Sequence, residues 1–111
     1  MRKVLRASVG LAALGLLTFP VHAATLTFTI ENKTGSVVEG FYASPVGTTD
    51  WEEDLLGDEV LMQGEKRQIS FEDSRNVCKY DLLFKFAADA SLEDVKDTKN
   101  LCELSTYTVY Q

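Results

Sequence analysis

The sequence predicts an all-β fold, a small antiparallel β-sandwich with one disulfide. Three observations lead to this fold class: short runs in which apolar and polar residues alternate, turn-forming residues between those runs, and two widely spaced cysteines in a chain of 111 residues. No repeat, linker or low-complexity tract divides the chain after residue 23. We therefore expect a single β-sandwich domain over residues 24–111, preceded by a distinct segment, residues 1–23.

The first two predicted strands cover residues 25–30 and 37–43. In the first strand, threonines alternate strictly with large apolar residues, which is typical of a half-buried strand. Residues 32–35 read Asn-Lys-Thr-Gly, and Asn and Gly tolerate the left-handed backbone of a tight reversal. Asn-Lys-Thr also matches the N-glycosylation sequon, but the bacterial character of the chain's start favours the turn role. The second strand is expected to stop at the sequence Ser-Pro-Val-Gly, residues 44–47.

Three further strands are predicted over residues 66–72, 80–86 and 104–110. The run 80–86 has the clearest pattern, because four large apolar side chains at alternate positions face one side. Leu83 lies on the opposite side, so we expect that second face to be partly covered as well. Residues 91–96 allow either a short strand or a capped helical turn. Five or more short strands separated by turns favour an antiparallel sandwich.

The two cysteines, Cys78 and Cys102, are predicted to form a structural disulfide. An oxidising compartment leaves one intramolecular pairing, which closes a loop of about 25 residues and stabilises the fold by roughly 3.5 kcal/mol. A redox pair would normally be spaced as C-x-x-C, and a zinc site would need two more soft ligands. Intermolecular pairing and free thiols are the alternatives.

Residues 1–23 have the character of a secretory signal. A basic start over residues 1–6 is followed by an uncharged apolar stretch over residues 8–19. Cleavage after Ala23 would place Val21 at the −3 position, whereas cleavage one residue later would place the bulky His22 there. A membrane anchor is the alternative, but the uncharged stretch is shorter than the roughly 20 residues that span a bilayer. The short, alanine-rich signal indicates a bacterial protein, and we expect it to be periplasmic or secreted.

Cleavage would make the remaining chain strongly acidic. It removes three basic residues and no acidic residue, so that eight basic residues would face seventeen acidic ones and the formal net charge would change from −6 to −9. Such a chain repels phosphate backbones and anionic headgroups. We therefore expect no nucleic-acid binding and no membrane binding after cleavage.

The cleaved segment also carries His22, the chain's one histidine. Without it, imidazole-based catalytic triads, histidine-ligated zinc and histidine pH switches are unavailable to the domain itself. The sequence also contains no G-x-S-x-G elbow and no glycine-rich phosphate loop. We predict that the protein is not an enzyme and that it needs no cofactor.

The most distinctive stretch is the acidic segment, residues 48–61. It surrounds the single tryptophan, Trp51, with six carboxylates. These acidic residues are Asp50, Glu52, Glu53, Asp54, Asp58 and Glu59.

Four interpretations of the acidic segment are open. It could be a solvated loop whose apolar residues pack on the sandwich, a docking surface for a basic partner, a calcium site, or a pair of catalytic carboxylates. The alternate spacing of Asp50, Glu52 and Asp54 matches the start of an EF-hand, but Leu55 and Leu61 stand where that motif needs glycine and glutamate. A glycosidase-type pair needs a cleft that so small a sandwich can hardly enclose.

Several motifs together resemble those of a group of small uncharacterised exported proteins of Gram-negative bacteria. These motifs are N-x-T-G at 32–35, Ser-Pro at 44–45, D-W-x-x-D-L-L-G at 50–57, C-x-Y-D-L at 78–82 and Leu-Cys at 101–102. The resemblance covers nearly the whole chain after the signal, and it implies an exported single domain without adding an activity. The chain departs from the pattern at Glu52, where the group has glycine.

The sequence therefore favours a non-enzymatic binding or interaction module, of the inhibitor or immunity type, for a protein partner with a basic surface. Trp51 is the expected anchor of this interaction, because aromatic residues dominate interface energetics. The carboxylates expected to take part with it are Asp50, Glu52, Glu53, Asp54 and Asp58.

Overall fold

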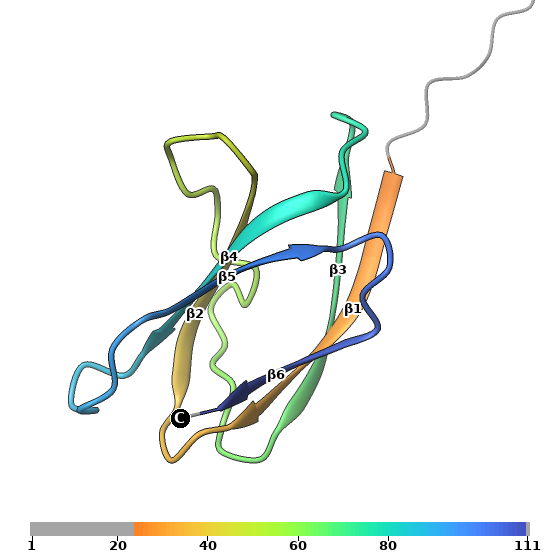
Figure 1. Cartoon of the computed structure of the whole chain (residues 1–111). Helices are drawn as coiled ribbons and strands as arrows, with labels where there is room; N and C mark the ends of the chain where they lie inside the picture. The colour runs from red at the N-terminus through yellow and green to blue at the C-terminus, as the bar shows by residue number, and fades with distance from the viewer. Residues whose placement is uncertain (1–23, 111) are drawn as a thin grey trace, which may run out of the picture.

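The computed structural model describes residues 24–110, so the predicted signal segment, residues 1–23, and Gln111 lie outside the described residues. Within residues 24–110 the chain forms six strands and no helix (Figure 1). The strands form two three-stranded sheets, and the predicted β-sandwich class is confirmed. In chain order the strands are β1 (Ala24–Lys33), β2 (Val38–Pro45), β3 (Lys66–Asp73), β4 (Lys79–Phe86), β5 (Val95–Asn100) and β6 (Thr106–Tyr110).

The first sheet has the strand order β3-β1-β6. Strands β1 and β3 are antiparallel, with Phe28 opposite Ile69. Strands β1 and β6 are parallel, with Ile30 opposite Tyr107. This parallel pair differs from the expected antiparallel arrangement, because the chain crosses from β5 in the second sheet to β6 in the first, and parallel neighbours need such a crossover.

The second sheet has the strand order β2-β4-β5 and is antiparallel throughout. Phe41 lies opposite Phe84, and Leu82 lies opposite Asp97. A short strand or a helical turn was expected over residues 91–96. The structure has a strand, β5, but it begins only at Val95 and runs to Asn100. An edge strand buries little, and its Val-Lys-Asp-Thr-Lys-Asn sequence carries no apolar alternation that could mark it in the sequence.

The core lies between the two sheets and is centred on aromatic rings. Phe41 of β2 contacts Phe28 of β1 edge to face, with ring centroids 6.0 Å apart, and stacks on Phe84 of β4 at 4.6 Å. Phe84 also stacks on Tyr107 of β6 at 5.3 Å. Leu83, on the outer face of β4, is only 3% exposed, which confirms that this second face is partly covered.

The turn after β1 depends on the side chain of Asn32, which is fully buried. Its Nδ2 atom donates to the carbonyl oxygens of Ser36, Leu61 and Met62 at 2.8–3.2 Å, and its Oδ1 accepts from the backbone N–H and hydroxyl of Thr34. The amide nitrogen that a glycan would occupy is therefore used inside the fold, in line with the turn role.

The mechanism expected for this turn was wrong. Positive φ angles within residues 24–110 occur at Asn76, Gly47, Gly57 and Gly64, and neither Asn32 nor Gly35 adopts one. The reversal is made instead by side-chain hydrogen bonds. Oδ1 of Asn32 accepts from the N–H of Thr34, as in an Asx turn, and the hydroxyl oxygen of Thr34 accepts from the N–H of Ser36.

The connection between β2 and β3, residues 46–65, runs back along the outer edge of β2 (Figure 1). Val38 and Leu61 exchange two backbone hydrogen bonds of 2.9 Å, and the N–H of Leu55 donates to the carbonyl of Phe41 at 2.7 Å. Leu56 and Leu61 are buried, being 5% and 0% exposed. These contacts fix the acidic segment, residues 48–61, against the sandwich.

Candidate functional site

The six carboxylates of the acidic segment do not form a single cluster. Asp54 accepts hydrogen bonds from the backbone, Glu52 binds an arginine of another loop, and Glu59 lies beside Arg67. The side chains of the other three, Asp50, Glu53 and Asp58, make no hydrogen bond or ion pair within the described residues. Their different surroundings separate structural carboxylates from those that a partner could reach.

Asp54 has a structural role. Its Oδ1 atom accepts hydrogen bonds from the backbone N–H of Phe41 at 3.0 Å and from that of Leu56 at 2.9 Å. The first bond satisfies a donor on the outer edge of β2, and the second closes an Asx turn at the return of the connection. At least one of the two carboxylate oxygens of Asp54, a predicted interaction residue, therefore accepts hydrogen bonds within the fold.

Trp51 is held in place through its two chain neighbours. The hydroxyl of Ser44 donates to the carbonyl oxygen of Asp50 at 3.3 Å and accepts from the N–H of Glu52 at 3.2 Å. Ser44 is 3% exposed, at the end of β2. The indole side chain between these two anchors is 38% exposed, so a fixed backbone presents a partly exposed aromatic residue.

Glu52 is fixed by Arg75 of the β3–β4 loop. The two guanidinium nitrogens Nη1 and Nη2 of Arg75 lie 2.7 and 2.8 Å from the Glu52 oxygens, which is the side-by-side geometry of a strong arginine–carboxylate pair. Arg75 also binds Asp73 through Nε and Nη2, both at 2.8 Å. One guanidinium thus connects the acidic segment to the end of β3.

The charges of this cluster reinforce one another. The Arg75 guanidinium holds the pKa of Asp73 well below its usual range, and the Tyr80 hydroxyl and the Arg75 backbone N–H add to the effect against the opposing influence of burial. The hydrogen bonds from Arg75 also lower the pKa of Glu52. Burial raises the pKa of Tyr80, and the hydrogen bond to Asp73 raises it further. The phenol therefore stays protonated and donates to Asp73.

Two shallow depressions flank Trp51 on the outer face of the second sheet. The smaller has a volume of about 90 Å³ and lies on the side of Thr48, Asp50 and Asp81. The larger, of about 280 Å³, lies towards Lys96 and Thr98 of β5. Trp51 and Asp81 line both depressions, so Trp51 lies next to each of them.

A third depression, of about 430 Å³, lies on the other side of Glu52. Its lining combines three apolar residues with four carboxylates, one serine and one arginine. The lining residues are Ala43, Leu55 and Phe71, with Glu52, Glu53, Glu72, Asp73, Ser74 and Arg75.

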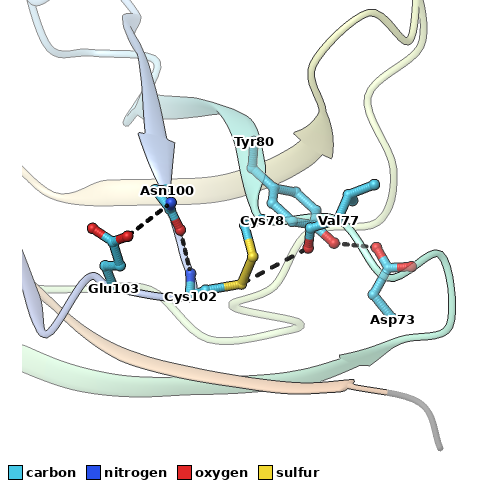
Figure 2. Close-up of a disulfide and its surroundings, with 7 residues drawn as sticks. All are labelled: Asp73, Val77, Cys78, Tyr80, Asn100, Cys102 and Glu103. Carbon is cyan, nitrogen blue, oxygen red and sulfur yellow. Dashed lines mark hydrogen bonds between the residues drawn. A yellow bond between two sulfur atoms is a disulfide. The ribbon is translucent and has the colours of Figure 1, made fainter.

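The disulfide between Cys78 and Cys102 forms as predicted (Figure 2). The two Cα atoms are 5.2 Å apart, and the bridge joins the start of β4 to the chain that follows β5. Beside it, the N–H of Leu101 donates to the carbonyl of Cys78 at 2.8 Å, and Asn100 accepts from the N–H of Cys102 at 3.0 Å. The bridge therefore ties neighbouring strands of one sheet, two residues before Tyr80.

Sequence reasoning missed Ser44 and Arg75, which hold the site in place. Ser44 was interpreted as the end of a strand, and Arg75 carries no motif. Each acts through a contact with a residue distant in the chain, and no spacing rule predicts a pairing such as that between Arg75 and Glu52.

No protein-family model, no curated protein and no solved structure matches this chain. Among residues 24–110, no three His, Cys, Asp or Glu side chains lie close enough to hold a metal ion. That part of the chain also contains no helix long and apolar enough to cross a membrane.

Proposed function

We propose that this protein is an exported, non-enzymatic binding module, of the inhibitor or immunity type, that uses the acidic segment around Trp51 to bind a basic surface of a partner protein. Export rests on the signal character of residues 1–23, and a periplasmic or secreted location follows from it. The disulfide between Cys78 and Cys102 is compatible with an oxidising compartment.

The observation that carries the proposal is the presentation of Trp51. Ser44 fixes the backbone on both sides of it, and Arg75 holds the adjacent Glu52, so little chain entropy remains to be lost on binding. A rigid, partly exposed indole beside two hollows is the kind of anchor that dominates protein interfaces.

The charge around this anchor favours a basic partner. The side-chain carboxylates of Asp50 and Glu53 make no hydrogen bond or ion pair within residues 24–110, and both residues are exposed. They flank Trp51 on a domain with eight basic and seventeen acidic residues. Such a surface accelerates association with a positively charged partner and discriminates against acidic ones.

The test begins with capture of periplasmic or secreted proteins on the purified mature chain, followed by measurement of Kd for the recovered partner. Trp51→Ala is expected to weaken binding roughly 30-fold, the effect of losing a hot-spot residue. The control is Met62→Ala, which truncates a more exposed apolar side chain at the far end of the β2–β3 connection and is expected to leave Kd within about threefold.

A second pair of variants tests the charge. Asp50→Asn with Glu53→Gln should slow association and flatten its salt dependence, whereas Asp89→Asn with Glu93→Gln removes the same charge from the β4–β5 connection and should do so less. Binding that is insensitive to salt and to Trp51→Ala would refute the proposed site.

A further inference from the structure

Two sheets have four outer edges, and the edge of β2 is already paired. The returning chain covers it through the hydrogen bonds between Val38 and Leu61 and those of Phe41 with Asp54 and Leu55. An uncovered edge is a template for another strand, and proteins usually block it with charges, proline, bulges or covering chain. The three remaining edges are β3, β5 and β6.

Two of these three edges carry charged residues. Strand β5 has Lys96, Asp97 and Lys99 within six residues. Strand β3 begins with Lys66 and Arg67 and ends in two acidic residues. Lysine and other charges on an edge oppose the addition of a further strand.

Within residues 24–110, strand β6 has none of these protections. Its sequence, Thr-Tyr-Thr-Val-Tyr, contains no charge, proline or glycine, and β-branched and aromatic residues favour strand pairing. It has a neighbour, β1, on one side only. Within residues 24–110 no backbone hydrogen bond reaches residues 106–110 from outside that ladder.

The register defines which groups of β6 are free. The N–H of Thr29 donates to the carbonyl of Ser105, and Thr29 lies opposite Thr106. In a parallel ladder the bonds then run to alternate residues, so the N–H and C=O groups of Thr106, Thr108 and Tyr110 face outward. Tyr110 is also the most exposed large hydrophobic residue described, at 67%.

We propose that β6 pairs with β6 of a second copy of this chain, antiparallel about a twofold axis through Thr108, so that two three-stranded sheets become one six-stranded sheet. Thr108 then faces Thr108 of the other copy, and Thr106 faces Tyr110. All outward backbone groups of the three residues become paired, and each exposed Tyr110 ring gains a β-branched cross-strand neighbour.

A second copy fits this edge for reasons of symmetry and charge. The strand is neutral, so the twofold register places no like charges opposite one another, and a partner strand needs no basic residues. A five-residue strand pair buries less than a standard interface of about 1,600 Å², so the dimer is weak and forms at high chain concentration.

The C-terminal end of β6 lies at the opposite end of the molecule from the chain around residue 50 (Figure 1), so the dimer leaves the proposed partner site free.

Cross-linking tests the register directly. In the twofold pair the Cα atoms of the two Thr108 residues are roughly 5.5 Å apart, a separation that a disulfide spans. Thr108→Cys is therefore expected to give a covalent dimer on mild oxidation while the native Cys78–Cys102 bridge stays intact. The control is Thr98→Cys, an exposed position on β5, another of the three remaining edge strands, which is expected to cross-link at least tenfold more slowly.

Sedimentation of the folded chain up to roughly 1 mM gives an independent measurement, since a small interface needs such concentrations. The wild type should approach dimer mass, and added salt should favour the dimer because it screens repulsion between two acidic copies. Salt has the opposite effect on the proposed partner complex, so the two inferences fail separately. Thr108→Lys should abolish the dimer, and Thr98→Lys should not.

Three results would overturn the dimer: a wild-type chain that stays monomeric with equal cross-linking at positions 98 and 108, a dimer that Thr108→Lys leaves intact, or slowed amide exchange at Thr106, Thr108 and Tyr110 that appears only when another protein is added. The last would mean that β6 accepts a strand from a different partner.

Discussion

The hydroxyl of Tyr80 donates a hydrogen bond to Oδ2 of Asp73, and this contact joins the two sheets of the sandwich. Tyr80 belongs to β4 and is fully buried, and Asp73 ends β3 with its side chain 5% exposed. Arg75 continues the connection from Asp73 outward to Glu52, next to Trp51. The core and the candidate interaction site therefore share one hydrogen-bonded chain of side chains.

Tyr80→Phe should lower the free energy of unfolding by about 1–3 kcal/mol, because it keeps the ring and leaves a buried carboxylate without one of its donors. Urea unfolding followed by tryptophan fluorescence measures the change. Tyr42→Phe is the matched control, since its hydroxyl makes no hydrogen bond within the described residues, and its expected effect is within about 0.5 kcal/mol. Equal effects of the two variants would contradict the role of the buried contact.

Acid should weaken the fold through Asp73. Its pKa is lowered in the folded state, so its contribution is fully present above the unfolded value of about 3.9 and is lost as the pH falls below that value. Asp73→Asn should therefore be less stable than the wild type from about pH 5 to 8, and the difference should shrink below about pH 4. The measurement is urea unfolding across pH. The control is Asp89→Asn at pH 7, at an exposed carboxylate without a hydrogen bond in the described structure, with an expected change within about 0.5 kcal/mol.

Removing the disulfide should cost roughly 3.5 kcal/mol of unfolding free energy, because its loop of about 25 residues is no longer closed in the unfolded chain. The Cys78→Ser, Cys102→Ser double variant tests this by denaturant unfolding. Wild-type protein under reducing conditions should match the double variant. A reduced wild type that keeps its full stability would show that the bridge contributes little.

The strands that could be predicted from the sequence are those that bury one face. In β1 and β4, alternating apolar residues end on the inner side of a sheet, and the pattern records their burial directly. Strand β5 was displaced because it lies at an edge and carries charges on both faces. The parallel pairing of β1 with β6 has no local signal either, since it depends on where the chain crosses between sheets.

The candidate site was predictable only in part. The grouping of carboxylates around Trp51 is visible in the sequence, but which of them are free is not. Asp54 is committed to backbone N–H groups and Glu52 to Arg75, while Asp50 and Glu53 remain accessible. These assignments follow from contacts between residues far apart in the chain, whose geometry exists only after the two sheets have packed.

Asn32→Asp should lower the free energy of unfolding by more than about 3 kcal/mol, because Asn32 is fully buried. In the wild type, Nδ2 of Asn32 donates to the carbonyls of Ser36, Leu61 and Met62. The variant keeps the Oδ1 acceptor for Thr34 but replaces this donor with a second oxygen, which faces the three carbonyl oxygens. Asparagine is the residue whose two ends suit both sets of partners.

The matched control for that change is Asn100→Asp, measured by the same urea unfolding. Asn100 is partly exposed, its Oδ1 accepts from the N–H of Cys102, and its Nδ2 reaches only Glu103 at 3.4 Å. Because aspartate preserves the stronger of these two contacts and water can solvate the new charge, the expected loss is within about 1 kcal/mol. If the two substitutions cost the same, the buried amide of Asn32 does not hold the β2–β3 connection to the end of β1, and the fixed backbone on which Trp51 is presented needs another explanation.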